Sequence, residues 1–232
     1  DLSLPKGQLE LGARLNFYQA EMARTFVSLQ AEANSDSDDD FSDRLDDVSD
    51  NTSKSSAIGL DVGMLWHDAN YQLGLTIYNL NEPSFDYPDL STYLTGESLA
   101  ALKGLEKAGK AQVSDSGTMT RHAVLEGAYH TSSRNWVLQG YYTMGTATDL
   151  MGDESRNMGV SAGYFSQSAL IPALRVGYNK NLVGTELSTV NAGTTLFGIF
   201  NLDVAMGLET SSIDGSETPR YLAFSLGFEE KF

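Results

Sequence analysis

Hydrophobic and polar residues alternate along most of this chain. In residues 8–18 the odd positions are apolar and the even positions are mostly polar or Gly. Residues 57–67 repeat the pattern, and it resumes in residues 71–77 after a short polar turn at 68–70. Alternation with a period of two residues is typical of a β-strand whose two faces meet different environments. The pattern predicts a hairpin formed by the last two of these segments.

The second half of the chain continues the alternation as a series of strands separated by turns. We predict about ten strand segments of roughly 10–12 residues each, a length that suits a tilted strand crossing a membrane. Strands of globular proteins average about 5–6 residues, so the length is the most informative feature. The predicted segments of the second half are 119–131, 136–147, 156–166, 170–180, 188–200, 201–210 and 221–229.

Residues 34–56 form an acidic interruption of the strand pattern. This stretch contains eight Asp residues but only two basic residues, Arg44 and Lys54. Such a run predicts a solvated loop. An EF-hand-like spacing places Asp36, Asp38, Asp40, Ser42 and Asp47 at ligand positions, which makes them a weak Ca²⁺ candidate. Phe41 stands where the motif requires Gly, and the twelfth position is Asp rather than Glu, so the simple loop is favoured.

Residues 83–118 form a second interruption, and by position they are the best candidate for ligand or partner contact. The insert begins with the aromatic residues Phe85, Tyr87 and Tyr93. Leu99 and Leu102 then follow at helical spacing, which predicts one short helix with Thr95 as its N-cap. The helix would either cap the interior of the sheet or cover its rim. Residues 20–30 fit a strand extension and a helix equally well.

The composition narrows the classes of function. The 232 residues include 31 acidic and 15 basic side chains, giving a net charge of -16, which argues against binding to nucleic acid. Cys is absent, so disulfides and thiolate metal sites are excluded. The longest apolar runs are too short for a membrane-spanning helix. The chain opens on Asp1 without a signal peptide, so we expect a processed exported protein or a fragment of a longer one.

The polar face of the predicted strands mixes small residues with isolated charges. A solvated surface normally carries more Lys and Glu and less Gly, whereas this mixture suits the interior of a narrow barrel. Arg14 and Arg175 are expected to pair with carboxylates of neighbouring strands. The residues predicted to face the interior are Glu10, Arg14, Asp61, Glu126, Arg175, Asp203 and Glu209.

Catalytic motifs are weak. The string Gly159-Val160-Ser161-Ala162-Gly163 matches Gly-x-Ser-x-Gly but lies inside an alternating run, whereas a nucleophile elbow needs a strand, a sharp turn and a helix. The carboxylates are spread over separate strands without a defining motif. We therefore expect no enzymatic activity, no catalytic residue, no cofactor and no firmly bound metal.

Two segments carry a family resemblance. Residues 58–90 contain Leu60-Asp61-Val62-Gly63, then Asn79-Leu80 with Pro83 and Phe85 following, and residues 173–182 read ALRVGYNKNL. These segments resemble the strands of the conjugal-transfer TraF-like family, which belongs with outer-membrane proteins related to the FadL fatty-acid transporters. The Gly-rich start and the Asn-Pro-Ala motif of FadL relatives are missing. The chain therefore resembles the C-terminal part of such a protein.

The resemblance and the pattern together lead to one hypothesis and one alternative. We expect residues 1–232 to form a single all-β domain, an antiparallel meander barrel of the Gram-negative outer membrane. The resemblance implies a role in plasmid conjugal transfer or in the passage of a small hydrophobic ligand. Its expected partners are outer-membrane lipid, such a ligand and transfer-apparatus proteins. The alternative is a soluble periplasmic β-barrel that binds a ligand inside, with side chains such as Phe224 in its core.

Overall fold

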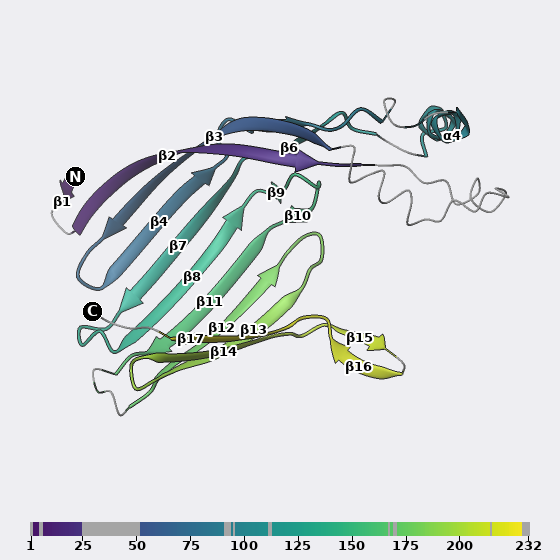
Figure 1. Ribbon diagram of the computed structural model, residues 1–232. Coiled ribbons are helices and arrows are strands. Elements are labelled where there is room, and N and C mark those ends of the chain that lie inside the picture. Colours follow the sequence, from purple (N-terminus) through teal and green to yellow (C-terminus); the bar gives the residue numbers. More distant parts are fainter. Residues whose placement is uncertain are drawn as a thin grey trace.

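A large antiparallel sheet dominates the computed structural model (Figure 1). The structure describes residues 2–4, 7–24, 52–90, 94, 96–110, 113–166, 168, 171–213 and 215–228. Within them the sheet has eleven strands, ten of which are long. The strands are β1 (Leu2–Leu4), β2 (Gly7–Met22), β3 (Ser53–His67), β4 (Tyr71–Tyr78), β7 (His122–His130), β8 (Trp136–Met144), β11 (Asn157–Tyr164), β12 (Ala173–Asn181), β13 (Ser188–Leu196), β14 (Phe200–Gly207) and β17 (Leu222–Phe228).

The large sheet is a meander. Its spatial order follows the order of the chain, β1-β2-β3-β4-β7-β8-β11-β12-β13-β14-β17, and every neighbouring pair is antiparallel. The longest pair joins β2 and β3, with Gln8 opposite His67 at one end and Met22 opposite Ser53 at the other. The all-β prediction and the long strands are therefore confirmed. The structure also resolves the choice between strand and helix for residues 20–22, which continue β2 as strand.

Tight turns join the strands at one end of the sheet. At the turn between β3 and β4, the carboxylate of Asp68 accepts hydrogen bonds from the backbone N–H groups of Asn70 (2.8 Å) and Tyr71 (2.7 Å). These two bonds hold the pKa of Asp68 below its ordinary value. Arg134, in the turn between β7 and β8, adopts a positive φ of 57°. The turns predicted at 68–70 and 132–135 are therefore confirmed.

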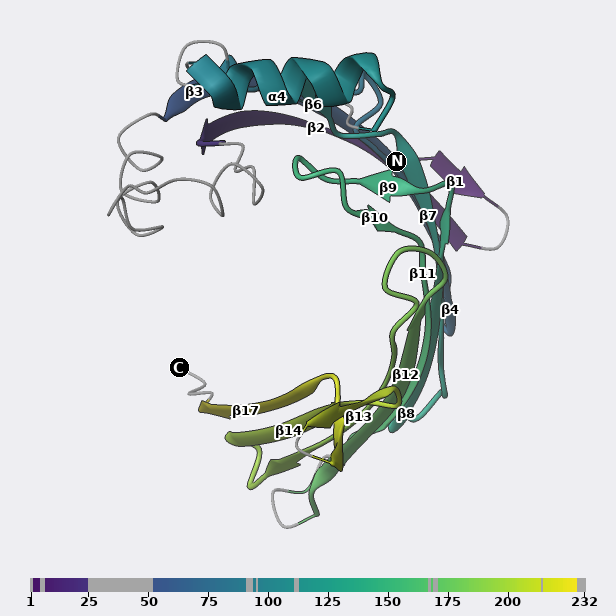
Figure 2. The same cartoon turned by 90° about the vertical axis from the view of Figure 1, so that its right-hand side faces the viewer.

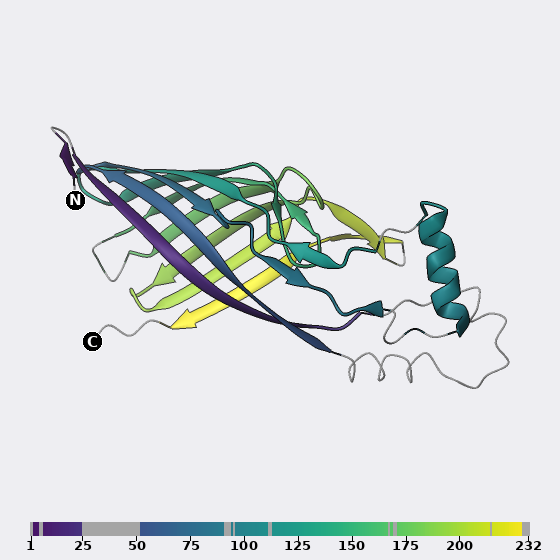
Figure 3. The same cartoon turned by 90° about the horizontal axis from the view of Figure 1, so that it is seen from above.

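The opposite end of the sheet carries longer connections with structure of their own (Figures 1 and 3). The two strands of one small sheet lie on either side of the helix in the sequence, and two further two-stranded sheets lie in later connections. The sequence did not predict the last of them, a hairpin between β14 and β17. These elements are β5 (Ser84–Asp86), α4 (Gly96–Lys107), β6 (Ser116–Thr118), β9 (Ala147–Thr148), β10 (Glu154–Ser155), β15 (Thr210–Ile213) and β16 (Ser216–Pro219), with β5 paired to β6, β9 to β10 and β15 to β16.

Helix α4 is the one helix predicted within residues 83–118. Its apolar side chains face a small cluster in which Leu90, Leu94 and Leu102 are buried and Leu99 packs against them. The helix ends where Gly109 takes a positive φ of 65°, which lets the Gly109 and Lys110 N–H groups bond back to the last turn. The proposed N-cap, Thr95, lies outside the described residues. In Figure 3 the helix stands beyond the ends of the strands.

The sheet curls so that its two faces differ sharply (Figure 2). We call the outer surface of the arc the convex face and the inner surface the concave face. Large apolar side chains occupy the convex face and are exposed, with Phe17 and Leu226 each 80% accessible. Phe224 is 70% accessible, so the described residues do not bury this side chain in a core, where the periplasmic alternative placed it. The sheet has no buried apolar core within the described residues. Buried hydrophobic side chains are confined to the insert: Phe85, Leu90, Leu94 and Leu102.

The predicted closed barrel is not formed by the described residues. β1 covers only the first residues of β2, up to Leu9, and β17 is paired on one side only. The arc therefore stays open in Figure 2. No helix among the described residues is long and apolar enough to cross a membrane.

Candidate functional site

An ion pair on the concave face ties the first strands together. Arg14 on β2 lies directly opposite Asp61 on β3, and its Nη2 and Nε atoms contact Asp61 Oδ2 at 2.8 and 3.1 Å. Asn16 Nδ2 donates to the same oxygen, and the Asn79 backbone N–H donates to Oδ1. The Asp61 side chain is 5% exposed, so its charge is fully engaged by these four donors. The arrangement joins β2, β3 and the residue after β4.

A second ion pair spans three strands further along the same face. Arg175 on β12 and Asp203 on β14 both lie opposite Gly193 on the intervening strand β13. Arg175 Nη2 reaches Asp203 Oδ1 at 2.8 Å by passing over this glycine. A Cβ atom at residue 193 would overlap Asp203 Oδ1. Arg175 Nη1 also donates to Thr195 Oγ1. Both arginines therefore pair with strand carboxylates, as the sequence predicted.

The other three predicted interior carboxylates have different surroundings. Glu10 Oε1 lies 3.1 Å from His67 Nε2 on β3. Glu126 lies on β7 and has no hydrogen-bond or ion-pair partner within the described part of the chain. Glu209 was predicted on a strand, but β14 ends at Gly207. Its Oε2 atom accepts the Ser188 backbone N–H at 2.8 Å, which holds the pKa of Glu209 below its ordinary value.

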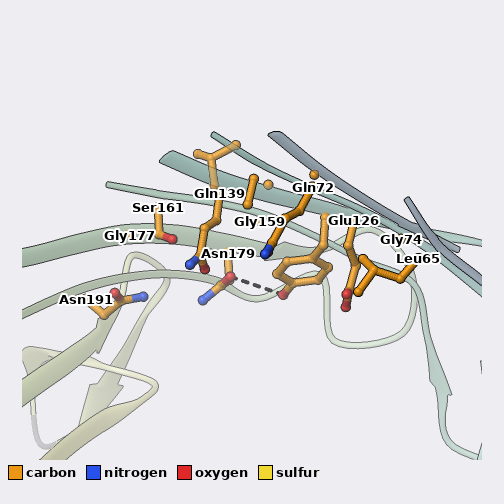
Figure 4. A pocket seen from close by; sticks show the side chains of 15 residues that line it. Leu65, Gln72, Gly74, Glu126, Gln139, Gly159, Ser161, Gly177, Asn179 and Asn191 are labelled. Atoms are coloured by element: carbon orange, nitrogen blue, oxygen red, sulfur yellow. Dashed lines mark hydrogen bonds between the residues drawn. The ribbon is translucent and has the colours of Figure 1, made fainter. Parts of the chain in front are cut away.

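The central part of the concave face contains a cavity of about 440 Å³. Its side chains come from two neighbouring rows of cross-strand partners. One row runs from Gln72 through Gln139 and Ser161 to Asn191, and the other contains Glu126, Tyr141 and Asn179. Figure 4 shows these side chains pointing into the hollow beneath the curved sheet. Glu126 is the one predicted site residue that lines this cavity.

Glycines alternate with the polar side chains in these two rows. Asn179 lies opposite Gly159, and a Cβ atom there would overlap both Asn179 Oδ1 and the ring of Tyr141. Asn191 lies opposite Gly177, where a Cβ atom would come within 2.6 Å of Asn191 Oδ1. The amide side chains therefore lie over the backbone of the next strand. Sequence reasoning missed them, although each Asn falls two residues from a Gly of the same strand face.

The insert forms a different site at the long-loop end. Phe85 is fully buried, with its ring 6.2 Å from that of Tyr18 on β2. Tyr87 Oη donates to the Leu150 carbonyl at 2.5 Å, which ties the insert to the connection between β8 and β11. Arg24, which the sequence did not single out, lies 5.4 Å from the centre of the Tyr87 ring. The Arg24 side chain also donates to the carbonyls of Pro88 and Ser114.

A larger cavity of about 820 Å³ opens beside these contacts. Tyr87 and Leu102 from the insert line it together with residues of β2 and of the connection between β8 and β11. Of the predicted contact residues, Leu99 packs on the buried leucine cluster instead. Tyr93 lies outside the described residues. The insert is therefore packed against the sheet through Phe85 and also borders a cavity.

The described residues contain no cluster of side chains that could hold a metal ion. No three His, Asp or Glu side chains come together there. The Ca²⁺ candidates Asp36, Asp38, Asp40 and Asp47 lie outside the described residues. Ser161 lies in the middle of β11, opposite Gln139 and Gly177, so the Gly-x-Ser-x-Gly string is part of a continuous strand. That position lacks the sharp turn that a nucleophile elbow requires.

Comparison with protein families identifies the family of this chain. The family described as "F plasmid transfer operon, TraF, protein" matches residues 1–142, more than half of the chain. The matched part includes the Arg14–Asp61 ion pair, the insert and Glu126. A search of curated proteins finds no match.

Proposed function

Because the chain belongs to the TraF family of the F plasmid transfer operon, we propose that it serves plasmid conjugal transfer as a β-barrel protein of the outer membrane. Its partners in this role are outer-membrane lipid and other proteins of the transfer apparatus. The FadL-like relationship that the strands suggested is part of the same proposal. The role is non-enzymatic, which agrees with Ser161 lying inside a regular strand and Asp61 being fully engaged by its four donors.

The observation that carries this proposal is the exposed apolar convex face. Removing apolar surface from water gains about 25 cal/mol of free energy per Å². An exposed apolar face of this extent is therefore expected to be buried against lipid or protein. Outer-membrane barrels supply it with lipid, and their strands alternate apolar side chains outward with polar ones inward. The convex apolar side chains that are at least half exposed include Leu11, Leu15, Phe17, Ile58, Leu73, Leu138, Val160, Leu174, Val176, Leu222, Phe224 and Leu226.

The distribution of connections supports the same assignment. Outer-membrane barrels have short turns at the periplasmic end and longer loops at the outer end. Here the tight turns gather at one end of the strands, and α4 with the small hairpins gathers at the other (Figure 3). We infer that the insert and its hairpins face outward from the cell. In that position the cavity beside Tyr87 and Leu102 is available to a small hydrophobic ligand or to a transfer-apparatus protein.

The test combines location with a matched pair of substitutions on β17. Phe224 lies on the convex face, and Ser225 is its neighbour on the concave face. An Arg at a lipid-facing position near the middle of a membrane costs about 2–4 kcal/mol, whereas an Arg in an aqueous interior does not. Phe224→Arg is therefore expected to reduce assembly in the outer membrane, and Ser225→Arg to preserve it. Each variant of the full-length protein is fractionated and run on a gel with and without boiling.

Recovery of a heat-modifiable band in the outer-membrane fraction, reduced by Phe224→Arg alone, supports the proposal. Recovery of the full-length protein in the soluble periplasm, monodisperse without detergent, contradicts it. In that case the convex face would need a protein cover, and the chain would be the ligand-binding periplasmic protein of the alternative hypothesis. Equal assembly of the two Arg variants contradicts the lipid contact as well.

A further inference from the structure

The amide-rich cavity on the concave face has unused hydrogen-bonding capacity. Within the described part of the chain, the side chains of Gln72, Gln139 and Asn191 make no hydrogen bond to another residue. Ser161 and Glu126 are equally unengaged. The one internal bond runs from Tyr141 Oη to Asn179 Oδ1 at 3.1 Å, which leaves the Asn179 amide nitrogen available (Figure 4). Five neighbouring polar groups without partners present a continuous set of donors and acceptors.

The charges of the lining limit the class of ligand. Glu126 is the lone acidic side chain among the lining residues, and none of them is Lys or Arg. An anionic ligand would therefore meet no positive charge. A metal cation would meet one carboxylate, which is too few for a site built of oxygen ligands. The groups that remain are carboxamides and hydroxyls, which pair equally well as donors and acceptors and favour an uncharged partner.

The shape of the cavity points to an elongated ligand rich in hydroxyl groups. The polar row from Gln72 on β4 to Asn191 on β13 crosses five strand intervals, an arc of about 24 Å at the usual strand spacing. The second row lies about 7 Å away along the strands. Gly159 and Gly177 leave room for the side chains of Asn179 and Asn191 to lie close against the sheet. Leu65 and Val160 are the two large aliphatic residues among those that line the cavity. A peptide would therefore make few apolar contacts there.

We propose that this cavity, lined by Gln72, Gln139, Asn179, Asn191, Glu126 and Tyr141, binds a neutral oligosaccharide. The carboxamides and the Glu126 carboxylate contact hydroxyl groups of successive sugar rings. Tyr141, which is 37% exposed, lies in the same row as Glu126 and Asn179. The inference does not depend on what covers the convex face, because every group it uses lies on the concave face.

The experiment measures binding to the purified full-length protein. A detergent without a sugar headgroup, lauryldimethylamine oxide, is used if the protein needs detergent, since a glycoside detergent would compete. Calorimetric titration is carried out with maltohexaose, cellohexaose and N-acetylchitohexaose. A sulfated hexasaccharide and a Gly-Ser peptide serve as charged and peptidic probes. We expect at least one neutral hexasaccharide to bind and the two other probes not to bind.

Matched substitutions assign the binding to the cavity. Gln139→Leu and Asn191→Leu remove amides that bond to no described residue, so the fold should be kept and the Kd should rise about tenfold. Gln19→Leu makes the same change on the convex face of β2 and should leave the Kd unchanged. Circular dichroism of each variant verifies that the sheet is retained.

Three results would overturn the inference. They are the absence of binding by all three neutral hexasaccharides, preferential binding of the sulfated or peptidic probe, and binding that Gln139→Leu and Asn191→Leu leave unchanged. None of them bears on the location of the protein, which the fractionation decides separately.

Discussion

Single side chains hold the concave face together, and Asp61 shows how one residue can organise three segments. Its four hydrogen bonds come from Arg14, Asn16 and the backbone of Asn79, which has a positive φ of 50°. We expect Asp61→Ala to lower the free energy of unfolding by about 2–4 kcal/mol, because it leaves the buried Asn79 N–H and the partly buried Asn16 amide without an acceptor. Urea unfolding followed by tryptophan fluorescence measures the change.

Arg14→Ala is the informative comparison for Asp61. The Arg14 side chain is 65% exposed, and its loss still leaves Asp61 two donors, so a smaller effect is expected. If the two variants were equally stable, the backbone and Asn16 contacts of Asp61 would contribute nothing.

The ion pair over Gly193 gives a second residue-level prediction. A Cβ atom at this position would occupy the place of Asp203 Oδ1 and would lie 3.3 Å from Arg175 Nε. Gly193→Ala should therefore separate the pair and destabilise the protein by about 1 kcal/mol, the usual size for a partly exposed ion pair. Gly12→Ala is the matched control, because no atom lies within 4 Å of the added carbon. Thermal unfolding of the two variants should differ, and equal midpoints would show that Asp203 moves aside without cost.

Glu209 makes the stability of the connection after β14 depend on pH. Its carboxylate accepts the N–H of the buried residue Ser188, and its pKa is lowered in the folded protein. A lowered folded-state pKa stabilises the fold above the unfolded-state value of about 4.5, and this stabilisation is lost as the pH falls through the folded-state pKa. The protection of the Ser188 amide hydrogen, measured as its exchange rate relative to the intrinsic rate at the same pH, should therefore fall on acidification. In Glu209→Gln this dependence should disappear, and an unchanged profile in that variant would exclude Glu209 as its cause.

At the scale of the elements, the insert is fixed to the sheet through a few polar contacts around an aromatic ring. Arg24 bonds to the carbonyls of Pro88 and Ser114 and lies against Tyr87, whose hydroxyl bonds to Leu150. Arg24→Ala should therefore free residues 83–118 and raise their rate of cleavage in limited proteolysis about tenfold, with little change in the sheet. Lys103→Ala changes an exposed residue of α4 and should be neutral. Equal cleavage of both variants would mean that Phe85 and the leucine cluster hold the insert without Arg24.

The strands were predictable from the sequence because the polarity of each residue indicates which face of the sheet it occupies. Alternation located the long strands other than β13, whose segment 188–200 is mixed and gave no certain register, and the leucine spacing located α4. The strands β15 and β16 were missed although the turn at 213–216 was recognised, because the flanking residues are mostly polar and have no period-two signal. The extent of β2 to Met22 was equally hidden until its partner Ser53 was known.

The candidate site was less predictable, because it depends on register. The two arginine pairs could be foreseen from complementary charges on one strand face. The amide rows could not, since Gln139 and Asn179 become neighbours of Ser161 and Gly159 only through the pairing of β8, β11 and β12. Glu209 was misplaced because the alternation runs two residues past Gly207, the end of β14.

At the scale of the whole molecule, the sheet has two edges that the proposed membrane location does not permit. β2 beyond Leu9 pairs only with β3, and β17 pairs only with β14 within the described residues. In a membrane each unpaired backbone group costs several kcal/mol, so barrels that cross membranes are closed. The assembled protein should therefore pair both edges with strands outside the described residues, from the same polypeptide or from another chain.

Hydrogen exchange tests this closure. The edge-facing amides of β17 should exchange at least a hundredfold more slowly in the protein assembled in outer-membrane vesicles than in the isolated 232-residue chain, because closure gives them partners. Amides of β8, which is paired on both sides by β7 and β11, are the internal control and should be protected in both samples. If β17 exchanged as fast in the vesicles as in the isolated chain, the edge would be open in the assembly. An open edge is incompatible with a lipid-facing barrel, so that result would leave the convex face to be covered by protein.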